Sequence, residues 1–226
     1  MWRLRFKRFI AIWQARYQQQ PIHPWLLKAW QQSRHADKQS WQHAKLLVVD
    51  IETTSLSPHG GEMVSIGWVA IHNAKIQLSS AQHLYLKNSN TVGDSATIHQ
   101  IRDCQLENGI SLEHALLALL QAATGHVLVF HHCPMDLRFL NYYCQKILSA
   151  PLFMPVIDTL QLEKIYLDRI GKPIQNGDLT LASIRIRYRL PPAPAHNALT
   201  DAIATAELLL AQLAHKDRQL NIAKLL

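Results

Sequence analysis

The sequence predicts an α/β domain built on a mixed β-sheet with helices on its faces. Short apolar runs such as KLLVVD and HVLVF are typical of strands buried on both faces of a sheet. Two longer strand-like segments follow the first run with a turn signal between them, which indicates an antiparallel hairpin. Helical and strand-like segments then alternate through the rest of the chain. This order is typical of parallel strands that are joined through helices.

Charge and tryptophan are concentrated at the start of the chain. Residues 1–45 carry nine Lys/Arg and one acid, giving +8, whereas residues 46–226 carry fourteen Lys/Arg and fifteen acids, giving −1. Five of the six tryptophans also lie in the first stretch. Composition therefore predicts a basic, Trp-rich helical extension over residues 1–44, a main domain over 45–215 and a tail over 216–226.

The extension is expected to form two helices. Large apolar side chains recur at helical spacing through residues 1–17, on one stripe made of Trp2, Phe6, Phe9, Ile10, Trp13 and Tyr17. Pro21 and Pro24 should end this helix, and a second, polar helix is expected over residues 25–40. The stripe is expected to pack on the main domain. Two alternatives stay open, namely contact of the arginines with nucleic acid and docking on an acidic membrane surface or a partner.

The elements of the main domain follow from local patterns. Strands are expected at residues 45–50, 62–71, 75–86, 126–130 and 155–160. Helices are expected over 110–123, from Pro134 to residue 148, over 159–170, from about residue 180, and from 198 to about 215. Pro134 suits the first turn of its helix, and Asn197 suits the N-cap of the last one.

Acidic residues border several of these apolar segments. Asp50 and Glu52 end the first strand and can share a face, because side chains two apart in an extended chain point the same way. Asp136 follows HVLVF, while Asp201 lies in the last helix with His196 just before it. Taken singly, each acid has an ordinary explanation, such as a solvated strand end or a favoured acid in the first turn of a helix. Together they favour a site for hard divalent cations, which carboxylates bind.

Three motifs, DIETT, HHCPMD and HNALTD, resemble those of the DEDDh group of 3′–5′ exonucleases, which includes the proofreading epsilon subunit of bacterial DNA polymerase III. The resemblance covers about residues 45–215. It implies an RNase H-like mixed sheet flanked by helices and two bound ions, Mg²⁺ or Mn²⁺. It implies metal ligation by Asp50, Glu52, Asp136 and Asp201. His196 would be the general base, and Thr53, Thr54 and His99 would contact substrate.

The expected activity is removal of nucleoside 5′-monophosphates from the 3′ end of single-stranded DNA, in proofreading or repair, with a polymerase or another replication or repair protein as a possible partner. An exoribonuclease of the same family and a non-catalytic nucleic-acid-binding module are the alternatives. Three cysteines without CxxC spacing favour a reducing cytoplasm. No apolar run approaches the length of about 18 residues that a membrane-spanning helix needs. Asp158 in VIDTL also matches an acid of the family, but a structural role at a helix start is expected for it.

Overall fold

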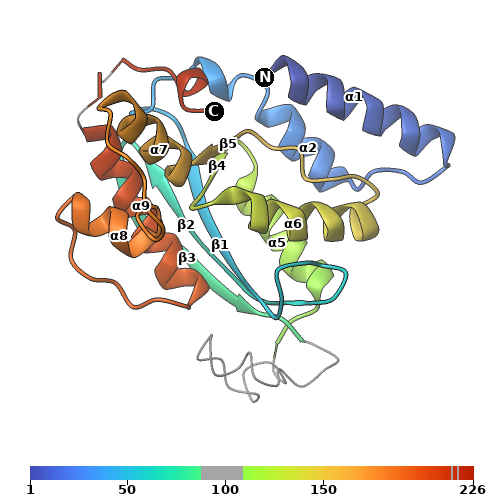
Figure 1. Ribbon diagram of the computed structural model, residues 1–226. Helices are drawn as coiled ribbons and strands as arrows, with labels where there is room; N and C mark the ends of the chain where they lie inside the picture. The colour runs from blue at the N-terminus through green and yellow to red at the C-terminus, as the bar shows by residue number, and fades with distance from the viewer. Residues whose placement is uncertain (88–108, 215, 218) are drawn as a thin grey trace.

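A computed structural model describes residues 1–87, 109–214, 216–217 and 219–226 (Figure 1). Its strands are β1 (Leu46–Thr53), β2 (Met63–His72), β3 (Lys75–Tyr85), β4 (Val127–Phe130) and β5 (Val156–Asp158). They form a mixed sheet in the order β3-β2-β1-β4-β5. β1, β4 and β5 run parallel, whereas β2 is antiparallel to both of its neighbours. The predicted hairpin and the predicted mixed sheet are confirmed.

Helices cover both faces of the sheet, so the fold has three layers (Figure 1). The helices of the main domain are α5 (Leu112–Ala123), α6 (Cys133–Leu148), α7 (Thr159–Arg169), α8 (Leu181–Arg187) and α9 (Ala198–Ala214). Alternate residues of β1 enter two apolar clusters. Leu47 and Val49 pack with α5 and α6, while Leu46 and Val48 pack with α9. Both faces of β1 are buried, which explains its nearly continuous apolar sequence.

Side chains that accept backbone hydrogen bonds mark where several helices begin. Ser111 caps α5, and Thr180 caps α8. The amide of Asn197 accepts from the backbone N–H of Thr200 at 3.2 Å, and α9 begins one residue after Asn197. The predicted N-cap of the last helix is therefore confirmed.

The N-terminal helices are α1 (Trp2–Tyr17) and α2 (Pro24–Gln32), followed by the short 3₁₀ helix η1 (Ala36–Lys38). The prediction of a second helix as far as residue 40 is wrong, because α2 ends at Gln32. The reason lies in Ser33, which is buried and whose hydroxyl donates to the carbonyl of Trp30 at 3.1 Å. Such local side-chain bonds compete with continued helix.

The apolar stripe of α1 faces away from the main domain, so the expectation that it packs there is wrong. Its six residues are 37–80% exposed, and they are Trp2, Phe6, Phe9, Ile10, Trp13 and Tyr17. The opposite side of the helix is the buried one, through Arg8, Ala11 and Ala15. Because Ala11 and Ala15 have small side chains, the backbone of α1 can pack close to the segments beneath it. Two small residues do not produce a recognisable apolar stripe in the sequence.

Arg8 fixes the orientation of α1. Its guanidinium donates to the carbonyl of Phe153 at 2.9 Å, to the carbonyl of Trp30 at 2.8 Å and to the hydroxyl of Ser33 at 2.8 Å. Burial lowers the pKa of Arg8 to about 10, with smaller contributions from Arg34 and Arg5. A buried cation with this many partners cannot rotate towards solvent without leaving carbonyls unpaired. The helix is therefore held with its aromatic side outward.

The N-terminal segment and the sheet share one core. Leu26, Ala29 and Trp30 of α2 belong to the same apolar cluster as Leu47 of β1. The boundary near residue 45 stays a prediction drawn from composition. Among the described residues, no helix is both long and apolar enough to cross a membrane.

Candidate metal centre

Three of the predicted acids meet where β1 passes beneath α9. Asp50 and Glu52 of β1 and Asp201 of α9 each offer a carboxylate oxygen, and these atoms all lie within 4.8 Å of one another. Asp50 and Glu52 share the α9 side of the sheet with Leu46 and Val48 because they have the same parity along the strand. The sequence-predicted pairing of these two acids with Asp201 is therefore seen in the structure.

Gly67 allows α9 to come this close. It lies opposite Asp50 in the β1–β2 ladder. A Cβ atom at Gly67 would clash with the backbone of Ala198 and Leu199 at the start of α9, and would lie 2.6 Å from the carbonyl oxygen of Ala198. Sequence reasoning missed this residue. The available signal was a glycine inside a strand pattern, which often marks a close backbone approach.

Asp136 lies beside this group rather than within it. It is buried in the first turn of α6, where the backbone N–H of Ile51 is close enough to lower the pKa of its carboxyl group. That N–H is available because β1 pairs with β4 only as far as Val48. Asp136 is nevertheless close enough to raise the pKa of Asp50. The structure thus places the fourth predicted acid next to the other three.

Burial raises the pKa of every acid in the cluster, and repulsion by neighbouring carboxylates adds to the rise for Asp50, Glu52 and Asp136. Burial raises the pKa of Glu52 to about 7, with a further rise from Asp201. The pKa of Asp136 rises to about 8, also mainly by burial. The pKa of Asp50 lies well above its ordinary value through burial, then through repulsion by Asp136, Glu52 and Asp201. Such a group of hard oxygen donors fits a divalent cation, whose charge would remove this repulsion.

The segment before α9 holds Asp201 through its backbone. The N–H groups of His196 and Asn197 donate to Oδ2 of Asp201 at 2.9 and 3.2 Å. Burial raises the pKa of Asp201, and these two hydrogen bonds oppose that rise. His196 has a left-handed backbone, with φ of 64°, and is exposed. It lies outside the helix, as the spacing between His196 and Asp201 predicted.

The predicted substrate-contacting residues have different positions. The hydroxyl of Thr53 donates to the carbonyl of Ser55 at 2.8 Å, and that of Thr54 accepts the N–H of Glu62 at 2.9 Å. Both bonds help to shape the loop that follows β1. His99 lies outside the described residues. Contacts of Thr53, Thr54 and His99 with substrate stay predictions.

Asp158 stabilises the starts of two helices next to the site. Its carboxylate accepts the N–H of Leu160 at 3.0 Å, so the predicted role at the start of α7 is confirmed. It also accepts the N–H groups of His132 at 2.9 Å and Cys133 at 3.1 Å. Asp158 therefore caps α6 as well, and so helps to place Asp136. Sequence reasoning did not predict this second role.

A family model described as exonuclease (RNase T) matches residues 47–209 of the chain. The chain belongs to this exonuclease family. The match covers β1, with Asp50 and Glu52, and most of α9, with Asp201. The resemblance found in the three motifs is thereby confirmed.

Curated relatives of this exonuclease are DNA polymerase III proteins by name. The chain is 31% identical to a DNA polymerase III PolC-type of Thermotoga petrophila over 82% of its own length but 13% of the relative. It is 25% identical to the DNA polymerase III subunit epsilon of Treponema pallidum, covering 79% of this chain and 80% of that one. The chain thus spans only a small part of the PolC-type proteins.

Solved structures show the same fold. Cell-death related nuclease 4 matches with a TM-score of 0.66 at 18% identity, over 78% of this chain and 66% of the other. The nuclease domain of 3′hExo, described as a DEDDh family member bound to rAMP, matches with a TM-score of 0.63 at 13% identity, over 80% and 98% of the two chains. The RNase H-like fold expected from the motifs is confirmed.

Proposed function

We propose that this exonuclease removes nucleoside 5′-monophosphates from the 3′ end of single-stranded DNA. The observation that carries the proposal is the convergence of Asp50, Glu52 and Asp201 within 4.8 Å. These three carboxylates would hold Mg²⁺ or Mn²⁺, and Asp136 would complete the ligands for a second ion. Such ions, when bound, lower the pKa of a coordinated water and stabilise charge on the phosphate and leaving oxygens.

His196 is proposed as the general base. Its ring is on an exposed segment outside α9, while the backbone N–H of the same residue contacts the ligand Asp201. This position beside the cluster suits a side chain that accepts a proton from the attacking water as the phosphorus–O3′ bond breaks. Histidine is the side chain that most often serves as a general base in enzymes.

The support for DNA comes from the names of relatives, which include PolC-type polymerases and the epsilon subunit. The metal chemistry itself does not distinguish deoxyribose from ribose, so an exoribonuclease is the alternative. A replicative polymerase or another replication or repair protein is the proposed partner, and a reducing cytoplasm is the proposed location.

A digest of matched DNA and RNA oligonucleotides tests the proposal. With Mg²⁺, 5′-labelled single-stranded DNA should yield a descending ladder of shortened products, whereas 3′-labelled DNA should release labelled mononucleotide at once. Chelator should stop both reactions, and added Mg²⁺ should restore them. Immediate mononucleotide release from the 5′ label would contradict the polarity, and faster digestion of RNA would favour the exoribonuclease.

A further inference from the structure

The outward side of α1 is an exposed aromatic ridge, formed by Trp2, Phe6, Phe9, Ile10, Trp13 and Tyr17. Trp13 is 61% exposed and stacks on Tyr17, with ring centroids 5.8 Å apart. Other large apolar side chains that are exposed in the described part of the chain are scattered over several elements. A gathering of this kind on one helix marks an interaction surface rather than ordinary surface composition.

Cationic side chains border the aromatic ridge on both sides. At about 100° per residue, Arg3 and Lys7 fall on one flank of α1, and Arg5 and Arg16 fall on the other. All four are exposed. A helix with an aromatic ridge between two rows of cations is suited to lie flat at a membrane interface, with its rings among the headgroups and its cations on anionic lipids.

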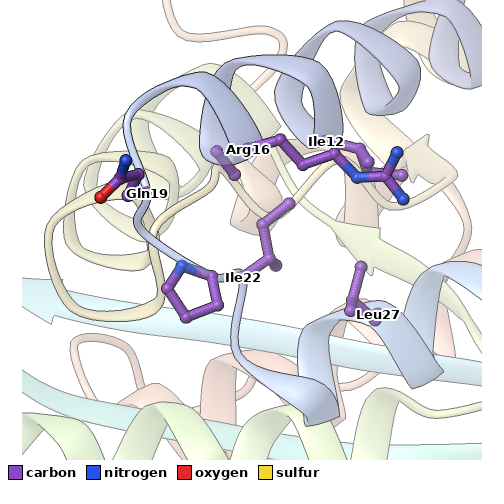
Figure 2. Close-up of a pocket in the computed structure, with 7 residues that line it drawn as sticks. Ile12, Arg16, Gln19, Ile22 and Leu27 are labelled. Atoms are coloured by element: carbon purple, nitrogen blue, oxygen red, sulfur yellow. The ribbon is translucent and has the colours of Figure 1, made fainter.

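A pocket extends the apolar surface on the Arg16 flank. Ile12 and Arg16 of α1 line a cavity of about 380 Å³ together with Ile22 and Leu27, as Figure 2 shows. Ala15, Gln19 and Pro21 complete the lining of this pocket between the two N-terminal helices. The Arg16 flank of α1 therefore combines a cationic side chain with an apolar pocket.

The aromatic ridge and the acid cluster lie at opposite ends of the parallel strands. Arg8 of α1 and Trp30 of α2 bond to the carbonyls of Phe153 and Leu152, in the segment that leads into β5. The acids lie instead where β1 approaches its carboxyl end. Figure 1 shows α1 along the outer side of the molecule, beyond α2 and α6. A surface bound to α1 would leave the acid cluster open to substrate.

We propose that the aromatic ridge of α1 binds an anionic phospholipid surface and anchors the exonuclease there. Charge complementarity selects this occupant, because residues 1–45 carry +8 while the rest of the chain is close to neutral. Single-stranded DNA would also meet cations and rings, but the ridge lies away from the acids that would process the strand. A second copy of the chain would bring two rows of like charge together.

Vesicle binding by the full chain tests the proposal. Trp2 and Trp13 are the exposed tryptophans among the described residues, so their fluorescence reports on the ridge. On adding vesicles of equal parts phosphatidylglycerol and phosphatidylcholine, the tryptophan emission maximum should shift to the blue. The protein should also sediment together with these vesicles. Pure phosphatidylcholine should bind at least about ten-fold more weakly, because each cation near an anionic surface contributes about five-fold in affinity.

Matched double variants distinguish binding through the aromatic ridge from non-specific hydrophobic adsorption to vesicles. Phe9→Ser with Trp13→Ser should weaken binding to the anionic vesicles at least about ten-fold, since two large apolar side chains no longer leave water. Arg3→Gln with Lys7→Gln should weaken it by a similar factor. The control, Leu78→Ser with Ile186→Ser, changes two residues of comparable exposure on β3 and α8 and should bind like wild type. Circular dichroism and the thermal midpoint establish that each variant is folded.

Three results would overturn the proposal. The first is equal binding to anionic and neutral vesicles. The second is unchanged binding by the folded Phe9→Ser/Trp13→Ser variant. The third is that the wild-type protein does not bind anionic vesicles at all. In that case, loss of affinity for a single-stranded oligonucleotide in the Phe9→Ser/Trp13→Ser variant would indicate a nucleic-acid surface, and loss of self-association in that variant would indicate a dimer interface.

Discussion

At the scale of single residues, the acid cluster is a group of charges that the metal-free fold disfavours. The pKa values of Asp50, Glu52, Asp136 and Asp201 are all raised, mainly because the carboxyl groups are buried. Each raised pKa means that the folded, metal-free protein stabilises the protonated acid relative to the unfolded chain. Removing one negative charge should therefore affect stability and activity in opposite directions.

Replacing Asp201 with Asn tests this opposition. Hydrolysis should fall by at least about a thousand-fold, because a ligand needed for charge stabilisation is lost. The metal-free thermal midpoint should stay level or rise, because the amide oxygen can still accept the N–H groups of His196 and Asn197 while repulsion of Glu52 disappears. Added Mg²⁺ should stabilise wild type more than the variant. Near-wild-type hydrolysis by folded Asp201→Asn would exclude Asp201 from the metal site.

His196 is best tested by replacement with Asn, because asparagine tolerates the left-handed backbone found there. Loss of a general base should lower the rate by about 10²–10⁴-fold. Metal affinity should change little, since the contact to Asp201 comes from the backbone N–H. Rate measurements from pH 5 to 9 should show that the variant loses the acidic limb of the wild-type profile. An unchanged rate and an unchanged limb would rule out the role of base.

At the scale of elements, the site depends on how closely α9 packs on the sheet. β1 supplies two acids at fixed positions, but Asp201 arrives on a separate helix. Gly67 sets the distance between the two, because its missing side chain makes room for the backbone of α9. The interior of the fold is close-packed, so α9 cannot absorb an added methyl group without moving.

The substitution Gly67→Ala should move α9 and draw Asp201 away from Asp50. We expect a loss of about 1–3 kcal/mol in the free energy of unfolding from overpacking. Hydrolysis should fall by at least about ten-fold, since sub-ångström placement matters in such sites. Gly60→Ala is the matched control, because a Cβ there would meet nothing within 4 Å. Equal activity of the two variants would show that α9 tolerates the shift.

At the scale of the whole molecule, a half-buried histidine pair links the end of β2 to the start of β4 and makes the stability of the fold depend on pH. His72 at the end of β2 and His126 just before β4 lie with their Nε2 atoms 2.8 Å apart. Burial lowers the pKa of His126 to about 4, and the pKa of His72 is also lowered, by burial and by Lys45. Both rings are therefore neutral in the folded state at pH 7.

The free energy of unfolding should decrease as the pH falls and these histidine rings become protonated. The unfolded chain binds a proton at His126 below about pH 6.5, whereas the folded chain does so only near pH 4, so stability should fall between these values. We expect about 2 kcal/mol from this residue, after allowing for its partial exposure. Denaturant unfolding at pH 7 and pH 5 should show a smaller difference for His126→Gln than for wild type. An equal difference would contradict the assignment.

Truncation should show that the N-terminal segment is part of the fold. Removing residues 1–40 takes Leu26 and Trp30 out of the core that contains Leu47. Each large core side chain contributes about 2–5 kcal/mol, so the truncated chain should have a much lower thermal midpoint. Arg3→Gln with Lys7→Gln should leave the midpoint unchanged, because both residues are exposed. A truncated protein as stable as wild type would show that the helices pack only loosely.

The strands, most helices and the family could be predicted from the amino-acid sequence, because local patterns indicate those features. Apolar runs mark strands buried on both faces, and DIETT, HHCPMD and HNALTD place acids at element ends. Local periodicity could also show that α1 has an aromatic side. It could not show which side is buried, because Arg8, Ala11 and Ala15 form a contact surface that does not look apolar.

How separate elements pack against one another could be seen only in the folded chain. The approach of α9 over Gly67, the closeness of Ile51 to Asp136 and the double capping by Asp158 join segments that are far apart in the chain. Such contacts depend on which surfaces pack together and on which backbone groups the sheet leaves unpaired. A one-dimensional pattern carries the chemistry of each residue, whereas the distances between residues are set by the packing of the whole chain.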